Sequence, residues 1–385
     1  MDYHPAPPLL ELPSAAAMVA LLAREPLTPQ FPPQAQTALA DRFGLDQSRW
    51  TTTVGELHSA GVLTSAAGLL AEPVTEARVH AVADETQAAR PTSPVLKPFW
   101  VHLQPFTICN QTCLHCYCSG GPKADPFLLS LDQWHEIIRR LDDYGVLDIY
   151  ITGGESLLLP GFFDLAADII SRGLGFGVST NATVLGGDRL ERLRELGASP
   201  VQVSLDGGQA ATHEMIRNAP GSWDKTLAGI RAIGGFTEVV INTVVNHINL
   251  RELEQVVQVG LGGGVRRFKF FPQKPVGRSN AAVTLDDATI LTVLLPECRR
   301  LAEAYDVEIE TISPTEGCGS GSIGFAVDQR GDAYPCIFGV ENRSLRAGNL
   351  LTDDLETMWF GSAVWEQFRG EPSTPCRRCE SSCPR

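Results

Sequence analysis

The feature that most constrains the fold is a repeated alternation of short apolar, β-branched runs with longer amphipathic runs, extending from Phe99 to about Asp306. Six such pairs are typical of a parallel sheet covered by helices. The expected strands are Val101–Thr107, Asp148–Thr152, Gly175–Thr180, Pro200–Leu205, Val239–Val244 and Arg267–Phe271, and helices are expected to begin near Ser130, Pro160, Gly186, Thr212, Asn249 and Leu285. Ser130 and Asn249 are expected N-caps, and Pro160 suits a first turn. We therefore expect an α/β fold, a partial (β/α)6 TIM-like barrel open on one side, with its chemistry at the carboxyl ends of the strands.

Four of the ten cysteines stand together directly after the first expected strand, in Cys109-Asn-Gln-Thr-Cys113-Leu-His-Cys116-Tyr-Cys118. The spacing C-x3-C-x2-C lets three thiolates of one tight loop converge on a single soft centre. A cubane cluster has four irons, so three ligands leave one iron open. The alternative is a structural zinc loop completed by Cys118 or by a distant ligand.

A second motif, Thr152-Gly153-Gly154-Glu155-Ser156, ends the second expected strand. Two glycines let the backbone approach a ligand closely, and Glu155 can accept hydrogen bonds from an ammonium group. Alone, such a turn is more often a loop without function. When it follows the C-x3-C-x2-C spacing, it is a stronger indication of a binding site. The third and fourth strands end in Ser179-Thr180-Asn181 and Ser204-Leu205-Asp206, for which strand-end capping is the alternative interpretation.

Together these motifs resemble the radical S-adenosylmethionine (SAM) enzymes, over about residues 99–385. The resemblance implies a [4Fe-4S] cluster on Cys109, Cys113 and Cys116, with SAM at the open iron. It implies reductive cleavage of SAM to a 5′-deoxyadenosyl radical that abstracts hydrogen from an unactivated carbon. It also implies an external electron donor such as flavodoxin or ferredoxin.

The resemblance further implies which residues surround SAM. Gly153, Gly154 and Glu155 would hold its amino group. Ser179 and Asn181 would lie near its ribose and carboxylate, and Ser204 near the same carboxylate, where Asp206 would help through His213 or Arg217. His115 would stack near the adenine, with Tyr117 just beyond. Cys118 is not an expected ligand, because a fourth thiolate would close the iron that SAM needs. It is instead a candidate catalytic residue. Arg278 can pair with a carboxylate, although an Arg after a Pro-x-Gly turn is commonly just solvated.

The C-terminal part carries five more cysteines. Cys318, Gly331 and Cys336 are spaced C-x12-G-x4-C, and Ile323–Val327 and Asp332–Pro335 read as a hairpin that brings the two cysteines together. The pattern resembles the auxiliary-cluster extension called SPASM, or twitch when it is shortened to one cluster. Full SPASM needs seven cysteines, so we expect one auxiliary [4Fe-4S] cluster on Cys318, Cys336, Cys376 and Cys379, with Cys383 as a substitute ligand and zinc as the rival metal. Cys298 reads as a buried small apolar residue.

The resulting domain prediction has three parts. Residues 1–97 form a mostly helical, winged-helix-like unit with a linker, residues 98–306 the partial barrel, and residues 307–385 a small cysteine-rich hairpin and helix domain. The first part contains expected short helices at Ala15–Leu22, Gln34–Phe43 and Thr53–Ala60. It resembles the leader-binding domain of enzymes that modify ribosomally made peptides (RiPPs). A helical cap over the barrel is the alternative.

Composition limits partners and location. A formal net charge of −14 argues against non-specific nucleic-acid binding. No apolar run reaches the ~18 residues of a membrane span, and no basic segment precedes the short apolar stretch Ala15–Ala23, so we expect a cytoplasmic protein without a signal peptide or membrane partner.

The sequence does not decide the class of substrate. The favoured reading is oxidative modification of a precursor peptide by a cross-link, thioether or dehydrogenation. A radical SAM dehydrogenase of a small molecule is the alternative enzyme. A non-catalytic zinc or iron–sulfur binding protein is the alternative from another class.

Overall fold

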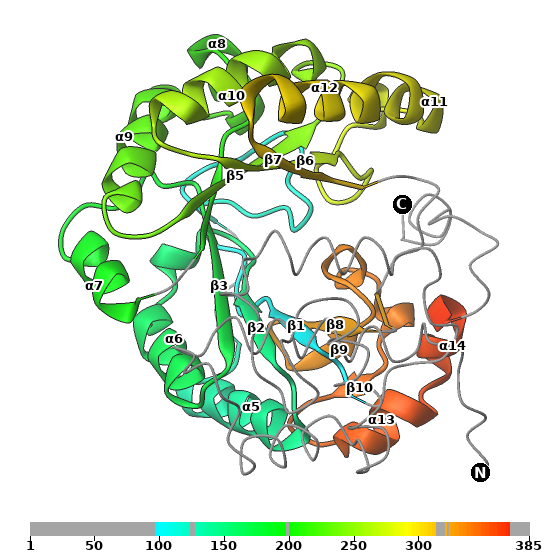
Figure 1. Ribbon diagram of the computed structural model, residues 1–385. Coiled ribbons are helices and arrows are strands. Elements are labelled where there is room, and N and C mark those ends of the chain that lie inside the picture. Colours follow the sequence, from blue (N-terminus) through cyan, green and yellow to red (C-terminus); the bar gives the residue numbers. More distant parts are fainter. Residues whose placement is uncertain (1–96, 124–127, 198–199, 313–319, 322, 370–385) are drawn as a thin grey trace, which may run out of the picture.

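The computed structural model describes residues 97–123, 128–197, 200–312, 320–321 and 323–369. Its strands form a sheet in the order β10-β9-β8-β1-β2-β3-β4-β5-β6-β7. From β8 through β1 to β7 neighbouring strands are parallel, whereas β9 and β10 continue from β8 as antiparallel strands. In Figure 1 the parallel strands curve into an open arc with α5–α12 on its outer side, and the C-terminal elements lie beside β1.

The elements have the following bounds. The strands are β1 Trp100–Leu103, β2 Asp148–Ile151, β3 Gly175–Thr180, β4 Val201–Ser204, β5 Val239–Val245, β6 Arg267–Pro272, β7 Glu308–Thr311, β8 Gly324–Val327, β9 Asp332–Tyr334 and β10 Gly348–Asn349. The helices are α5 Leu131–Tyr144, α6 Phe162–Ser171, α7 Arg189–Leu196, α8 Ala210–Arg217, α9 Ser222–Gly234, α10 Leu253–Gly262, α11 Asp287–Thr289, α12 Leu295–Tyr305, α13 Leu355–Gly361 and α14 Ala363–Arg369. Short helical turns are η2 Ser156–Leu158, η3 Leu250–Glu252, η4 Ala281–Val283, the π-helical η5 Ile290–Leu294, η6 Ile337–Gly339 and η7 Arg343–Leu345.

The six predicted strands are confirmed, and β3 agrees at both ends. The first strand is shorter than predicted. The amide of Gln104 still donates to Val327 at 2.8 Å, but Pro105 has no N–H and ends the ladder. The chain then turns into the cysteine loop.

The two predicted N-caps, Ser130 and Asn249, use their side chains differently. Ser130 accepts from the Gln133 amide at 3.2 Å, and Gln133 Oε1 accepts from the Ser130 amide, so the two form a capping box. Asn249 is the N-cap residue of η3, as predicted from its position, but its side chain makes no capping hydrogen bond. Its Nδ2 instead donates to the carbonyls of Asp206 and Val244, each at 3.0 Å, and so joins the carboxyl ends of β4 and β5.

Some described elements lie beyond the six predicted units. Helix α9 follows α8 between β4 and β5, β7 extends the sheet beyond β6, and β8 extends it beyond β1. The predicted hairpin is confirmed as β8 and β9. The fold is therefore the predicted partial barrel of α/β type, extended at both sheet edges by strands from after residue 306.

One apolar cluster fills the space between the sheet and the outer helices. It includes Ile149 and Ile151 of β2 and Phe268 and Phe270 of β6, while the alternate strand residues face the other way. Cys298 belongs to this cluster and is 3% exposed, as predicted. Among the described helices, none is long and apolar enough to cross a membrane. The three helices expected before residue 97 lie outside the described residues.

Candidate metal and cofactor site

The cysteine loop follows β1 at the carboxyl ends of the parallel strands, where the barrel argument predicts the chemistry. The sulfurs of the three expected cluster ligands, Cys109, Cys113 and Cys116, each accept one N–H hydrogen bond. The amide of Gln111 donates to Cys109 Sγ at 3.4 Å and the amide of Gly120 to Cys116 Sγ at 3.3 Å. Arg217 Nη1 donates to Cys113 Sγ at 3.7 Å. N–H donors aimed at sulfur stabilise thiolates, which is the form that binds metal.

Burial opposes the thiolate form unless a cation is present. It raises the pKa of the Cys109 thiol to about 12 and also raises the pKa of Cys113. A bound metal removes that penalty because it supplies the missing positive charge. In the part of the chain that is described, no three Cys, His, Asp or Glu side chains converge around a position for one metal ion. In a four-iron cluster each thiolate binds its own iron. Three cysteines whose sulfurs each accept an N–H hydrogen bond are a donor set that fits such a cluster.

The Gly-Gly-Glu turn packs directly against the cysteine loop. The amide of Gly154 donates to Phe106 O at 3.2 Å and that of Glu155 to Ile108 O at 2.9 Å. A Cβ on Gly153, whose φ is +120°, would lie 2.2 Å from Phe106 O, and one on Gly154 would lie 1.9 Å from Ile108 O. These glycines are thus required by a close approach of the chain to itself, a reason that differs from the expected approach to a ligand.

Glu155 is 2% exposed and joins the ends of β2 and β3. Its oxygens accept from Thr180 Oγ1 at 2.6 Å, from the Asn181 amide at 2.8 Å and from the Leu157 amide at 3.3 Å. Burial raises the pKa of this carboxyl, against the lowering effect of those donors. A carboxylate has about four acceptor positions, so one remains for an ammonium group.

Tyr117 and Cys118 hold the same turn from the other side. Tyr117 Oη lies 3.0 Å from Thr152 Oγ1, and Cys118 Sγ donates to Gly153 O at 3.1 Å. The two sulfurs of Cys116 and Cys118 are 3.7 Å apart. Cys118 is 3% exposed, and its contacts with Cys116 and Gly153 join the cysteine loop to the glycine turn.

Asp206 is the centre of a buried charge network. Its Oδ2 lies 2.6 Å from Arg217 Nε and 2.7 Å from His115 Nε2, and its Oδ1 accepts from the Val244 amide at 2.9 Å. Burial favours the neutral carboxyl, but Arg217 and then His115 outweigh it and hold the pKa of Asp206 well below its usual range. His213 Nδ1 accepts from the Asp206 amide at 3.2 Å, and burial lowers the pKa of His213 to about 4. The expected association of Asp206 with Arg217 and His213 is present, and His115 joins it.

The remaining expected SAM neighbours lie at adjacent strand ends. Asn181 Nδ2 donates to Asn110 Oδ1 of the cysteine loop at 2.8 Å. Ser179 and Ser204 are half-buried near the ends of β3 and β4, on the strands' inner, non-helical side.

Sequence reasoning missed the contribution of Gly277 and Arg278. The Arg278 amide donates to Cys116 O at 3.0 Å and its Nε to Cys113 O at 3.1 Å. A Cβ on Gly277, at φ +64°, would lie 2.3 Å from the carbonyls of Cys116 and Tyr117. This segment after β6 clamps the cysteine loop. The Pro-x-Gly-Arg turn was the available signal, but nothing in the sequence told which loop it would touch.

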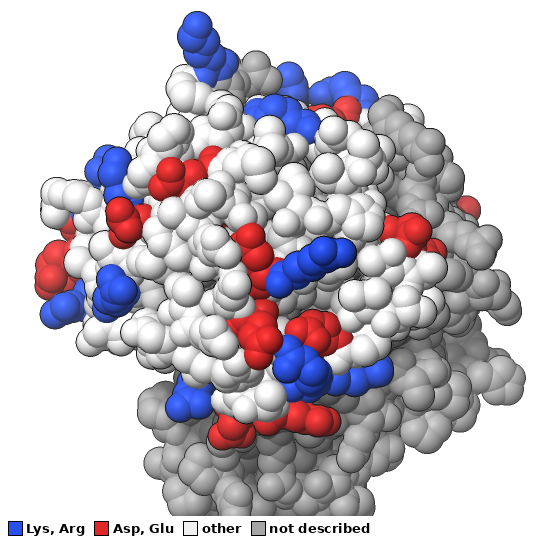
Figure 2. Space-filling model, turned by 90° about the horizontal axis from the view of Figure 1, so that it is seen from above, with Lys and Arg blue, Asp and Glu red and all other residues white. Residues whose placement is uncertain are grey.

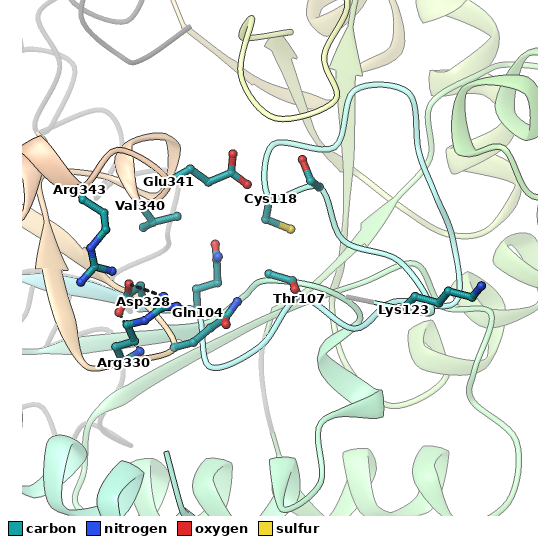
Figure 3. A pocket seen from close by; sticks show the side chains of 11 residues that line it. Gln104, Thr107, Cys118, Lys123, Asp328, Arg330, Val340, Glu341 and Arg343 are labelled. Atoms are coloured by element: carbon teal, nitrogen blue, oxygen red, sulfur yellow. Dashed lines mark hydrogen bonds and ion pairs between the residues drawn. The ribbon is translucent and has the colours of Figure 1, made fainter. Parts of the chain in front are cut away.

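A cavity of about 470 Å³ lies beside this site, between the barrel and the segment after β8. From the barrel side it is lined by Gln104, Thr107, Cys118, Ser119 and Lys123, and from the other side by Asp328, Gln329, Arg330, Val340, Glu341 and Arg343. Figure 3 shows the Cys118 thiol and the Glu341 carboxylate facing the same space, with Lys123 at the far end. Most of this lining is polar, with charges of both signs.

Of the predicted auxiliary ligands, Cys336 is described. It follows β9 and is 8% exposed. Cys318, Cys376, Cys379 and Cys383 lie outside the described residues.

Comparison with known proteins gives consistent matches to both halves of this arrangement. A family model described as the radical SAM superfamily matches residues 103–259, and one described as an iron-sulfur cluster-binding domain, SPASM, matches residues 318–383. The chain is 28% identical over 296 residues to the sporulation killing factor maturation protein SkfB of Bacillus subtilis, covering 74% of this chain and 71% of that protein. It is 26% identical over 303 residues to an AdoMet-dependent heme synthase of Methanosarcina barkeri, covering 71% and 85%.

The crystal structure of Streptococcus suis SuiB bound to precursor peptide SuiA has the same fold. The TM-score is 0.63 at 15% identity, and the match covers 87% of this chain and 80% of that chain.

Proposed function

Because the chain belongs to the radical SAM superfamily and carries a SPASM iron–sulfur domain, we propose that it oxidatively modifies a ribosomally made peptide by a cross-link, a thioether or a dehydrogenation. The observation that carries the proposal is the polar cavity between the barrel and the SPASM region, next to the cysteine loop. A peptide segment offers amide groups and charged side chains that such a lining can bind. The names of the Bacillus subtilis and Streptococcus suis proteins support a peptide substrate.

Cys109, Cys113 and Cys116 would hold the SAM-binding [4Fe-4S] cluster, and Cys318, Cys336, Cys376 and Cys379 one auxiliary cluster, with Cys383 as a substitute. When bound, the first cluster and SAM supply reductive cleavage of SAM and hydrogen abstraction from carbon. An external flavodoxin or ferredoxin would supply the electron.

The chain's own residues would orient SAM and enclose it. Glu155, fixed by Thr180 and Asn181, would accept a hydrogen bond from the SAM ammonium at its remaining acceptor position. Tyr117 and Cys118 would keep the glycine turn at a fixed distance from the cysteine loop. Ser179, Ser204 and Asn181 would form the polar wall near the ribose and carboxylate.

The decisive first experiment is anaerobic reconstitution with iron and sulfide, followed by an assay for 5′-deoxyadenosine. We expect SAM cleavage by the wild type. The triple variant Cys109→Ala, Cys113→Ala, Cys116→Ala should lose it while iron on the C-terminal cysteines remains. Cleavage retained by that variant contradicts the ligand assignment, and no cleavage by a fully loaded, reduced wild type favours a non-catalytic iron–sulfur or zinc protein.

The substrate class is tested separately. Incubation with a short peptide encoded beside this gene should give a product lighter by two hydrogens in mass spectrometry. Deleting residues 1–90 should abolish capture of that peptide if residues 1–97 bind its leader, whereas unchanged capture favours a cap. The heme synthase match and a cavity volume that also suits a small molecule make a small-molecule oxidation the second candidate. Oxidation of a small molecule with no change in any encoded peptide would select it.

A further inference from the structure

The three N–H donors to the loop sulfurs are not equivalent. Those of Cys109 and Cys116 come from backbone amides of the loop itself. The donor to Cys113 is the Arg217 guanidinium, which comes from the end of α8, more than one hundred residues along the chain. It is therefore the one charged donor of the three, and the one that a substitution can remove without changing the loop.

Arg217 is held in place by Asp206. The Nε of Arg217 lies 2.6 Å from Asp206 Oδ2, while Nη1 reaches Cys113 Sγ at 3.7 Å. Arg217 is 7% exposed and Asp206 is fully buried, so water screens neither charge well. Two ends of the guanidinium are thus committed to the chain, one to a carboxylate and one to a sulfur.

A cation that donates to a cluster thiolate stabilises the reduced cluster more than the oxidised one, because reduction adds a negative charge. A nearby carboxylate acts in the opposite sense. The reduction potential of the cluster therefore depends on two opposing effects. Arg217 contacts the sulfur and raises the potential, and Asp206, which lies behind Arg217, lowers it.

We infer that Arg217 is a positioning and tuning residue for the SAM-binding cluster: its hydrogen bond to Cys113 raises the reduction potential of that cluster, and Asp206 moderates the increase. This inference rests on the proposed ligand role of Cys113. It differs from the expected role of Arg217 near the SAM carboxylate, since it concerns the cluster whether or not SAM is bound.

The test is an anaerobic potentiometric titration of the reconstituted full chain, followed by electron paramagnetic resonance. The SAM-binding cluster is identified as the part of the signal that changes when SAM is added. In Arg217→Met the ratio of reduced to oxidised cluster at a fixed potential should fall at least about tenfold, equivalent to about 59 mV for one electron. In Asp206→Asn the same ratio should rise. Arg217→Lys, which keeps the charge but not the fork, should lie between wild type and Arg217→Met.

Arg189→Met is the matched control, because Arg189 donates to the backbone carbonyls of Leu157 and Gly186 and, among the described residues, to no sulfur. It should leave the potential unchanged. Shifts of the same sign in Arg217→Met and Asp206→Asn, or no shift in Arg217→Met and Arg217→Lys with full iron content, would overturn the inference. A wild type without a SAM-responsive signal counts against the proposed function instead, so the two failures are distinguishable.

Discussion

Replacing Gly154 by alanine tests whether the glycine turn and the cysteine loop are one interlocked unit. The new Cβ would lie 1.9 Å from Ile108 O and 2.5 Å from Ile108 C. Both are backbone atoms, so no side chain can rotate away. Restoring a 3.0 Å contact requires a backbone displacement of at least 1.1 Å, the difference between 3.0 and 1.9 Å.

That displacement breaks two backbone hydrogen bonds, from Gly154 to Phe106 O and from Glu155 to Ile108 O. Overpacking costs about 1–3 kcal/mol and each lost bond about 0.5–1.5 kcal/mol, so the free energy of unfolding should fall by about 2–6 kcal/mol. Because the cysteine loop moves with the turn, the variant should also retain less iron after reconstitution.

The measurements are urea unfolding of the apo-protein and iron per chain. Gly262→Ala is the matched control, since a Cβ there, in α10, meets nothing within 4 Å. It should change the free energy of unfolding by no more than about 1 kcal/mol. If Gly154→Ala unfolds at the same urea concentration as Gly262→Ala, the turn and the loop are not interlocked as described.

Two further predictions concern Cys118 and Asp206. Cys118→Ala should weaken SAM binding about fivefold by removing the donor to Gly153 O, whereas Cys118→Ser should restore it and neither should lose iron. Loss of iron in Cys118→Ser would make Cys118 a ligand. For Asp206, the folded pKa lies below the unfolded value of about 3.9, so its stabilising effect is complete above that value and is lost as the pH falls toward the folded pKa. In urea unfolding of the apo-protein, the free energy of unfolding of the wild type should exceed that of Asp206→Asn by about 3–5 kcal/mol at pH 7. This difference should shrink below about pH 4. A pH-independent difference would contradict the assignment.

The barrel was predictable because its signals are local. Short apolar, β-branched runs between longer amphipathic runs predicted six strands, and β3 was bounded correctly at both ends. The seventh parallel strand, Glu308–Thr311, was missed because two of its four residues are glutamates and none of its side chains is fully buried. An edge strand of this kind gains its order from pairing with β6, which a local pattern does not reveal.

The candidate site was predictable as a set of residue types but not as a set of contacts. Spacing identified the cysteines, and the Gly-Gly-Glu turn identified the neighbouring strand end. The partner of each residue depends on which strand ends lie side by side, and that is a property of the sheet order. Asn249 is an example of what the sequence does not reveal. Its sequence context is that of a helix cap, but its side-chain amide donates hydrogen bonds to two strand-end carbonyls.

Cys118 illustrates how this limit affects functional reasoning. From the sequence, a fourth cysteine next to C-x3-C-x2-C can be a ligand, a catalytic thiol or a bystander, and the choice rests on counting irons. In the fold its sulfur donates to the carbonyl of Gly153, the first glycine of the next strand's turn. A residue in that position affects the cofactor site through geometry, because any change in its size moves Gly153 relative to Cys116. Its contribution should therefore follow the volume and donor capacity of the side chain, which serine preserves, and should not follow the chemistry unique to sulfur.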